Sequence, residues 1–188
     1  MNDKNRGVSF SRNKAISVAQ GEYLAFLDCD DYWEINKIEV QMDFMLTHGY
    51  DFSYTTYQVV NKDGKIVDKI RAREKLGYNE LLKSCDIGLS SVILKRKLLR
   101  DIKFPELKTK EDFVLWLSLA KKSVNLFGLN KSLMFWRQTP NSLSSSILQK
   151  LKDAFKVYYL YEKKNFFYSI YCVIRLSTYA LLKKINSY

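Results

Sequence analysis

The sequence contains few of the residues that build disulfides or histidine metal sites. It has one histidine, His48, and three cysteines, Cys29, Cys85 and Cys172, among 188 residues. A lone histidine excludes a histidine-rich metal site, and it excludes a hydrolase that needs a second histidine. The cysteines are odd in number and far apart, so they predict neither a disulfide framework nor a zinc site. They favour a reducing cytoplasm.

Sequence typical of linkers, leader peptides and membrane spans is scarce as well. Two prolines and seven glycines leave little room for a flexible linker, and the chain contains no internal repeat. Residues 1–14 are polar and basic, without the apolar segment of a signal peptide. Residues 166–182 are apolar but include Arg175, and they reach only the lower length limit of a span. We therefore expect a helix that lies on a membrane or packs on the domain, rather than one that crosses the bilayer.

The residues that are abundant indicate a globular α/β protein. Hydrophobic residues make up 47% of the chain and charged residues 27%, which is the composition of a folded domain. Apolar runs typical of strands alternate with segments of helical periodicity, which predicts an α/β domain with a mixed sheet. The expected strands are residues 23–27 (a buried parallel strand), 52–60, 65–70, 89–94, 124–129 and 133–137. The expected helices are residues 11–19, 34–48, 79–84, 95–100, 111–121, 147–164 and 166–185.

A change in composition near residue 146 divides the chain into a domain of residues 1–146 and a helical tail of residues 147–188. The whole chain has 31 Lys and Arg and 20 Asp and Glu, a net charge of +11. The tail contributes eight basic and two acidic residues after Leu148, interspersed with Tyr and Phe. Basic residues among aromatics favour an anionic membrane surface, although a merely solvated surface remains the plain alternative. No zinc-finger spacing or base-stacking motif is present, so nucleic acid is not expected as a partner.

Three carboxylates, Asp28, Asp30 and Asp31, directly follow the first expected strand. Ligands bind at the carboxyl ends of strands in open α/β sheets, so the position suits a site. Such close carboxylates repel one another, and Mg²⁺ or Mn²⁺ relieves this when bound by one or two of them together with diphosphate oxygens and water. The alternative is a helix N-cap, worth about 1 kcal/mol, but a cap needs only one aspartate.

Together with four other segments, this cluster resembles glycosyltransferase family 2, which comprises inverting enzymes with the GT-A fold. The resemblance covers about residues 5–145. It rests on residues 7–16 with Arg12-Asn13, Gly21-Glu22-Tyr23, Leu27-Asp28-Cys29-Asp30-Asp31, residues 110–117 with Glu111-Asp112, and Arg137 with Ser142-Leu143-Ser144. It implies a Rossmann-like mixed sheet with a C-terminal helical tail. Nothing in residues 1–20 matches the preceding segments with which the family grips the nucleotide, so we expect an N-terminally truncated GT-A domain.

The resemblance also implies roles for the carboxylates. Asp28 and Asp30 would form the Asp-x-Asp pair that binds Mg²⁺ or Mn²⁺ and the donor diphosphate, with Asp30 as the direct ligand. Asp31 would support the metal site or the donor sugar. Asp112 would be the general base for the acceptor hydroxyl, and Glu111 would orient the acceptor or Asp112. Without the resemblance, Glu111 and Asp112 read as charges that complement a helix N-terminus.

Three further residues have roles by the same resemblance. Arg12 and Asn13 would lie near the nucleotide, although Arg12 could equally pair with a surface carboxylate. Arg137 would reach the diphosphate across a closing loop, with a solvated strand end as the alternative. Trp116 reads as a core residue, and His48 as a surface residue or a helix cap.

The expected function is transfer of a sugar from a nucleotide-sugar, expected to be a UDP-sugar, to a cell-surface polysaccharide or lipid-linked glycan. The protein would act in the cytoplasm, as a peripheral protein at the inner face of the cell membrane. One alternative is a catalytically incomplete remnant or partner subunit of such an enzyme. Another is a basic membrane- or nucleic-acid-binding protein in which the acidic motifs are only caps.

Overall fold

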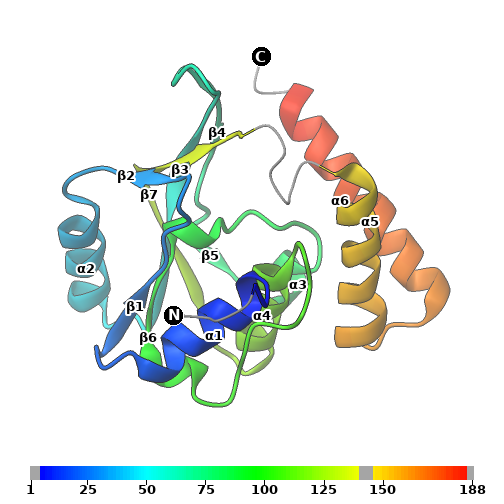
Figure 1. Ribbon diagram of the computed structural model, residues 1–188, viewed down its shortest axis with the longest axis horizontal. Coiled ribbons are helices and arrows are strands. Elements are labelled where there is room, and N and C mark those ends of the chain that lie inside the picture. Colours follow the sequence, from blue (N-terminus) through cyan, green and yellow to red (C-terminus); the bar gives the residue numbers. More distant parts are fainter. Residues whose placement is uncertain (1–4, 140–145, 186–188) are drawn as a thin grey trace.

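A mixed seven-stranded sheet forms the centre of the fold in the computed structural model, which describes residues 5–139 and 146–185 (Figure 1). Neighbouring strands follow the order β1 (Tyr23–Ala25), β6 (Ile93–Lys95), β3 (Phe52–Val60), β7 (Leu126–Arg137) and β2 (Tyr32–Trp33). In addition, β4 (Ile66–Ile70) pairs with β3, and β5 (Lys75–Leu76) pairs with β7. Only the β3–β7 pairing is parallel among these strands.

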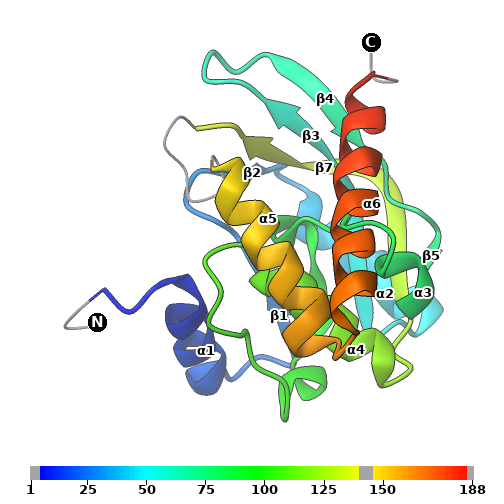
Figure 2. The same ribbon diagram turned by 90° about the vertical axis from the view of Figure 1, so that its right-hand side faces the viewer.

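Helices cover both faces of this sheet (Figure 1). The helix α2 (Lys37–His48) lies on one face, and α1 (Val8–Val18) and α4 (Glu111–Lys121) lie on the other. Short helical turns connect the strands: α3 (Tyr78–Leu81), η1 (Leu89–Ser91) and η2 (Arg96–Leu99). An outer layer contains α5 (Ile147–Lys156), the π-helical turn η3 (Val157–Tyr161) and α6 (Phe166–Ile185). Figure 2 shows α5 and α6 antiparallel and side by side in this layer.

The core forms between β3 and α4. Both elements are rich in apolar residues on more than one face, and both are largely buried. β3 is rich in aromatic and β-branched residues and is buried along most of its length. Phe52 of β3 packs edge-on against Trp116 of α4, with ring centroids 5.2 Å apart. The prediction that Trp116 is a core residue is confirmed, because its side chain is fully buried. Tyr158 and Cys172 of the outer layer join the same cluster, so this layer is docked on the domain.

The predicted α/β architecture with a mixed sheet is confirmed, and the helices at residues 111–121 and 166–185 have the predicted bounds. The first strand was expected to be parallel, but β1 pairs antiparallel with β6. Two strands were predicted at residues 124–129 and 133–137, but the single strand β7 runs through both from Leu126 to Arg137. The strand predicted at residues 89–94 begins with the turn η1, and only Ile93–Lys95 form the strand β6. The helix predicted at residues 95–100 is the short turn η2, and the helix predicted at residues 147–164 ends at Lys156, where the π-helical turn η3 follows. Apolar runs specify burial, but they do not specify strand direction or the local winding of a helix.

Two smaller predictions depend on local chemistry. His48 is exposed, and its ring nitrogen Nδ1 lies 2.9 Å from the Phe44 carbonyl, which confirms a surface position. The helix ends there because Gly49 adopts a left-handed conformation with φ of 68°. No helix in the described part of the chain is both long and apolar enough to cross a membrane. The boundary near residue 146 adjoins residues 140–145, which lie outside the described residues, so the division into domain and tail stays a prediction.

Candidate active site

The first acidic cluster lies on the turn between β1 and β2. The Asp31 N–H donates to the Asp28 carbonyl at 3.0 Å and closes this turn. The Asp31 side chain accepts hydrogen bonds from the Ser90 hydroxyl at 2.6 Å and from the Arg137 N–H at 3.1 Å. The Asp30 carboxylate accepts one from the Thr139 hydroxyl at 3.2 Å. The turn is therefore tied to η1 and to the end of β7.

Ser90 is a buried residue that the sequence analysis missed. Its hydroxyl accepts a hydrogen bond from the Asp28 N–H at 3.1 Å and donates the bond to Asp31. Its carbonyl accepts a bond from Trp33 Nε1 at 2.7 Å. The sequence around Ser90 is an apolar run that does not indicate this role, because the partners of Ser90 lie about sixty residues away along the chain. Only the fold reveals that Ser90 fixes two of the three aspartates.

The second acidic cluster, Glu111 and Asp112, forms the first turn of α4. Lys110 precedes it in a left-handed conformation with φ of 67°, and the Asp112 side chain accepts a bond from the Phe113 N–H at 2.7 Å. Burial raises the pKa of Asp112 above its usual range, and the charge of Asp28 raises it further. Burial also raises the pKa of Glu111, as does the neighbouring charge of Asp112. A carboxylate with a raised pKa is suited to accept a proton near neutral pH.

Arg12 joins the two acidic clusters. Its Nη2 donates to Asp28 Oδ1 and its Nη1 to Glu111 Oε1, both at 2.5 Å. The Arg12 side chain is 14% exposed, so little water screens these bonds. Arg12 thus pairs with carboxylates, and both partners are predicted site residues. Its predicted position near the nucleotide stays a prediction. The turn after β1 and the start of α4 therefore meet at one guanidinium.

The Asp31 carboxyl is partly buried, and this burial opposes its ionised form. Burial raises its pKa to about 6, against the lowering effect of the bonds from Ser90 and Arg137. The charges of Asp28 and Asp30 add to the rise. A cation bound near the turn would relieve this repulsion.

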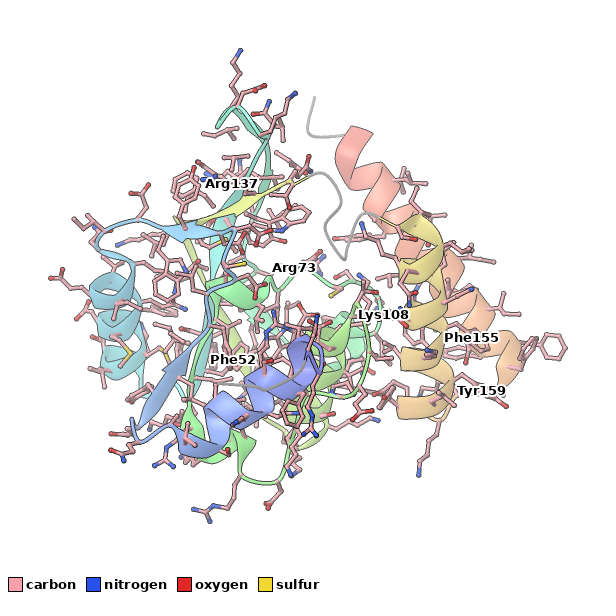
Figure 3. The ribbon with its side chains drawn as sticks, in the orientation of Figure 1. Phe52, Arg73, Lys108, Arg137, Phe155 and Tyr159 are labelled. Atoms are coloured by element: carbon pink, nitrogen blue, oxygen red, sulfur yellow. The ribbon has the colours of Figure 1, made fainter. Side chains whose placement is uncertain are left out.

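Two predicted residues lie beside these clusters without touching a carboxylate through their side chains. The Asn13 side chain donates to the Phe104 carbonyl and accepts from the Phe104 N–H, both at 2.9 Å. The Arg137 guanidinium lies over the ring of Tyr32, 5.4 Å from its centroid, at the exposed end of β7 (Figure 3). Their predicted roles at the nucleotide and the diphosphate stay predictions. The Ser142-Leu143-Ser144 segment lies outside the described residues.

The carboxylates suit a hard divalent cation as partial ligands. Within residues 5–139 and 146–185, no group of three or more His, Cys, Asp or Glu side chains is arranged to hold a metal ion. Asp28 and Asp30 offer oxygen ligands on one turn, and the Asp28 side chain is 41% exposed, with Oδ1 bonded to Arg12. Mg²⁺ commonly takes one or two protein carboxylates and completes its shell with phosphate oxygens and water. The residues present fit that mode of binding, with Asp28 and Asp30 as the candidate ligands.

Comparison with known proteins identifies the family. Residues 1–104, more than half of the chain, match the sequence pattern of Glycosyl transferase family 2. The chain belongs to this family. TuaG of Bacillus subtilis (strain 168), named for a glycosyltransferase of teichuronic acid biosynthesis, is 36% identical over 184 residues, which are 97% of this chain and 73% of TuaG. The WfgD protein of Escherichia coli, named UDP-Glc:alpha-D-GlcNAc-diphosphoundecaprenol beta-1,3-glucosyltransferase, is 39% identical over 158 residues, which are 83% of this chain and 61% of WfgD.

Solved structures confirm the GT-A fold of this family 2 glycosyltransferase chain. S. aureus TarS 1–349 in complex with UDP-GlcNAc matches with a TM-score of 0.65 and 21% identity over 89% of this chain. The complex of the same protein with UDP matches with a TM-score of 0.59 and 19% identity. The chain spans 51% of the TarS 1–349 chain and less than two thirds of WfgD.

The Arg12 bridge predicts a coupled effect on stability. Replacing Arg12 with Gln should lower the free energy of unfolding by about 2 kcal/mol, because Glu111 would remain buried without its partner. The double variant R12Q/E111Q should recover at least half of that loss in urea unfolding. The exposed Arg100→Gln is the matched control and should change stability by less than about 0.5 kcal/mol. An equal loss of unfolding free energy in R12Q and in the double variant would contradict the bridging role of Arg12.

The raised pKa of Asp31 predicts a pH-dependent effect with a definite sign. The folded state holds this proton more tightly than the unfolded state, so the group's contribution to stability falls as pH rises from about 4 to about 6. Asp31→Asn removes this dependence. The unfolding free energy of the variant relative to the unaltered protein should rise by about 1 kcal/mol between pH 4 and pH 7, after allowance for solvent screening. Asp43→Asn, an exposed change on α2, controls for the lost charge; a pH-independent difference for D31N would refute the assignment.

Proposed function

We propose that this chain transfers a sugar from a UDP-sugar to a lipid-linked or cell-surface glycan, with a divalent metal and with inversion at the anomeric carbon. The observation that carries the proposal is the meeting of Asp28 and Glu111 on Arg12, which brings the two acidic clusters into one site. The names of TuaG and WfgD support a glycan of the cell envelope as the acceptor. The TarS complexes with UDP-GlcNAc and UDP support a nucleotide-sugar donor.

Asp112 acts as the general base in this proposal. It accepts the proton of the acceptor hydroxyl while that oxygen forms a bond to the anomeric carbon. The bond between that carbon and the diphosphate breaks at the same time, and the nucleoside diphosphate leaves with the electron pair. A single in-line displacement of this kind inverts the anomeric centre. Support comes from the raised pKa of Asp112, which keeps its carboxylate basic enough for the transfer.

The remaining site residues hold and orient the substrates. Asp28 and Asp30 are the proposed ligands of Mg²⁺ or Mn²⁺, which when bound would neutralise charge on the leaving diphosphate. Asp31 supports the donor side from its bonds to Ser90 and Arg137. Glu111 orients the acceptor or Asp112.

We further propose that the protein acts in the cytoplasm, as a peripheral protein on the inner face of the cell membrane. Support comes from the outer face of the α5–α6 layer, which carries apolar side chains where a soluble surface is normally polar. On α6, Phe167 is 82% exposed and Ile174 is 57% exposed. On the α5 side, the Phe155 ring stacks on Tyr159 with centroids 5.3 Å apart, on the side of the molecule away from the sheet (Figure 3). Exposed apolar side chains gathered on one layer in this way are typical of a docking surface.

Charge favours an anionic bilayer as the occupant of that face. Lys152, Lys156 and Lys163 of the same layer are exposed. Lysines with interfacial aromatics bind anionic lipid headgroups, while their apolar neighbours enter the acyl boundary. A second copy of the chain would instead bring lysines against lysines. A membrane surface would also bring the protein to a lipid-linked acceptor.

The donor and metal proposal predicts distinct defects for two aspartates. The chain should bind UDP-glucose or UDP-GlcNAc in the presence of Mn²⁺, measured by calorimetry, and Asp30→Ala should abolish the metal-dependent part. Asp112→Asn should retain donor binding and lower sugar transfer by about 10²–10⁴-fold, since only the base is lost. Asp43→Asn on α2 is the control and should behave as the unaltered chain.

No metal-dependent donor binding by the unaltered chain would contradict the proposal. That result would favour the second candidate, a partner subunit that needs another chain to bind the donor.

The membrane proposal predicts binding that depends on the outer face of α6. The protein should sediment with vesicles that contain phosphatidylglycerol and should bind less at high salt. F167S/I174S should weaken this binding about tenfold or more, because two inserted apolar side chains are lost. Leu46→Ser is the matched control, since Leu46 is 63% exposed on α2, across the sheet from this layer (Figure 1). Equal binding by F167S/I174S and the unaltered protein would contradict the proposal.

A further inference from the structure

Lys37 is a fully buried lysine in the first turn of α2, and no described carboxylate forms an ion pair with it. Its ammonium donates to Gln41 Oε1 at 2.8 Å and lies 4.3 Å from the ring centroid of Trp33. Burial lowers the pKa of Lys37 to about 7, because the charged form loses its hydration. A buried amine without a counter-ion is costly, so its place in the fold calls for an explanation.

Both neighbours of the Lys37 amine hold the same turn. Trp33 Nε1 donates to the Ser90 carbonyl at 2.7 Å, and Gln41 Nε2 donates to the Ser91 carbonyl at 3.0 Å. Gln41 also donates to the Ser53 hydroxyl at 2.9 Å, which ties it to the central strand β3. Two consecutive carbonyls of η1 are thus fixed by the two side chains that contact the amine.

The turn held in this way is the one that supports the first acidic cluster. The Ser90 hydroxyl accepts the Asp28 N–H and donates to Asp31. Trp33 itself lies in β2, two residues after Asp31, so its contact with η1 also fixes the end of the acidic turn. A continuous chain of contacts therefore runs from Lys37, through Trp33 and Gln41, to the carboxylates.

We propose that Lys37 is a positioning residue for the carboxylates of the Asp28–Asp31 turn, acting through Trp33 and Gln41 on Ser90 and Ser91. The amine holds the indole ring and the Gln41 amide in the one arrangement in which both donate to η1. That Lys37 aids binding of the metal and the donor rests on the proposed function. That it positions the Asp28–Asp31 turn does not depend on the proposed function. Supporting contacts of this type commonly change metal affinity by about 10–100-fold when they are removed.

The test compares Lys37→Met, which keeps the length of the side chain and removes its donors, with Lys62→Met at the exposed hairpin turn. Hydrogen exchange is measured at the Asp28 and Arg137 amides, which donate within the acidic turn and its supports. Exchange at both amides should accelerate about tenfold or more in K37M, with α4 amides unchanged. Affinity for Mn²⁺ in the presence of UDP should fall about tenfold or more in K37M and stay constant in K62M.

Trp33→Phe provides a second variant that retains a ring but loses the bond to Ser90. It should reproduce the exchange effect, and W33F/K37M should be no worse than the stronger single change, because both act on one chain of contacts. Unchanged exchange at Asp28 and Arg137 in K37M and W33F would overturn the proposal. If the unaltered chain binds no Mn²⁺, the proposed function fails and the exchange result alone decides the role of Lys37. If K37M does not fold, W33F decides it.

Discussion

The ion pairs of Arg12 are the interaction on which the candidate site depends. One planar guanidinium reaches Asp28 on the turn after β1 and Glu111 at the start of α4. Two different nitrogens of the guanidinium bond the two carboxylates, a geometry that the single nitrogen of a lysine does not offer. Without that cation, partly buried carboxylates from two elements would repel each other at the same place. α1 therefore carries the charge that allows the turn and α4 to approach.

The site is electrostatically unfavourable, and the core beneath it stabilises the arrangement. Asp31, Glu111 and Asp112 all have pKa values raised by burial, so each ionised form opposes folding near neutral pH. The α4 helix that begins with two of them is buried along nearly its whole length, with Trp116 packed on Phe52 of β3. Apolar burial at this helix offsets the cost of its acidic first turn. Buried carboxylates with raised pKa values, which lower the stability of the fold, are common where a protein binds charged ligands.

The sequence predicted the features whose cause is local. Continuous apolar periodicity gave the bounds of α4 and α6, and three closely spaced aspartates indicated the acidic turn. Features that depend on distant partners were missed: the direction of β1, the merging of two predicted strands into β7, and the contacts of Ser90. No role was predicted for Lys37 from the sequence, yet its side chain is fully buried and contacts Trp33 and Gln41. The role of such residues follows from packing between elements, which a single sequence does not encode locally.

One contact joins the outer helical layer to the acidic start of α4. The buried Asp153 carboxylate of α5 accepts hydrogen bonds from both the N–H and the hydroxyl of Thr109, each at 3.0 Å. Thr109 lies two residues before Glu111, so α5 restrains the segment that carries the proposed general base. Tyr158 and Arg175 further bind the Leu82 carbonyl, which anchors the same layer to the domain. If the outer face of this layer lies on a bilayer, as proposed, these bonds hold Asp112 in a fixed position relative to the lipid surface.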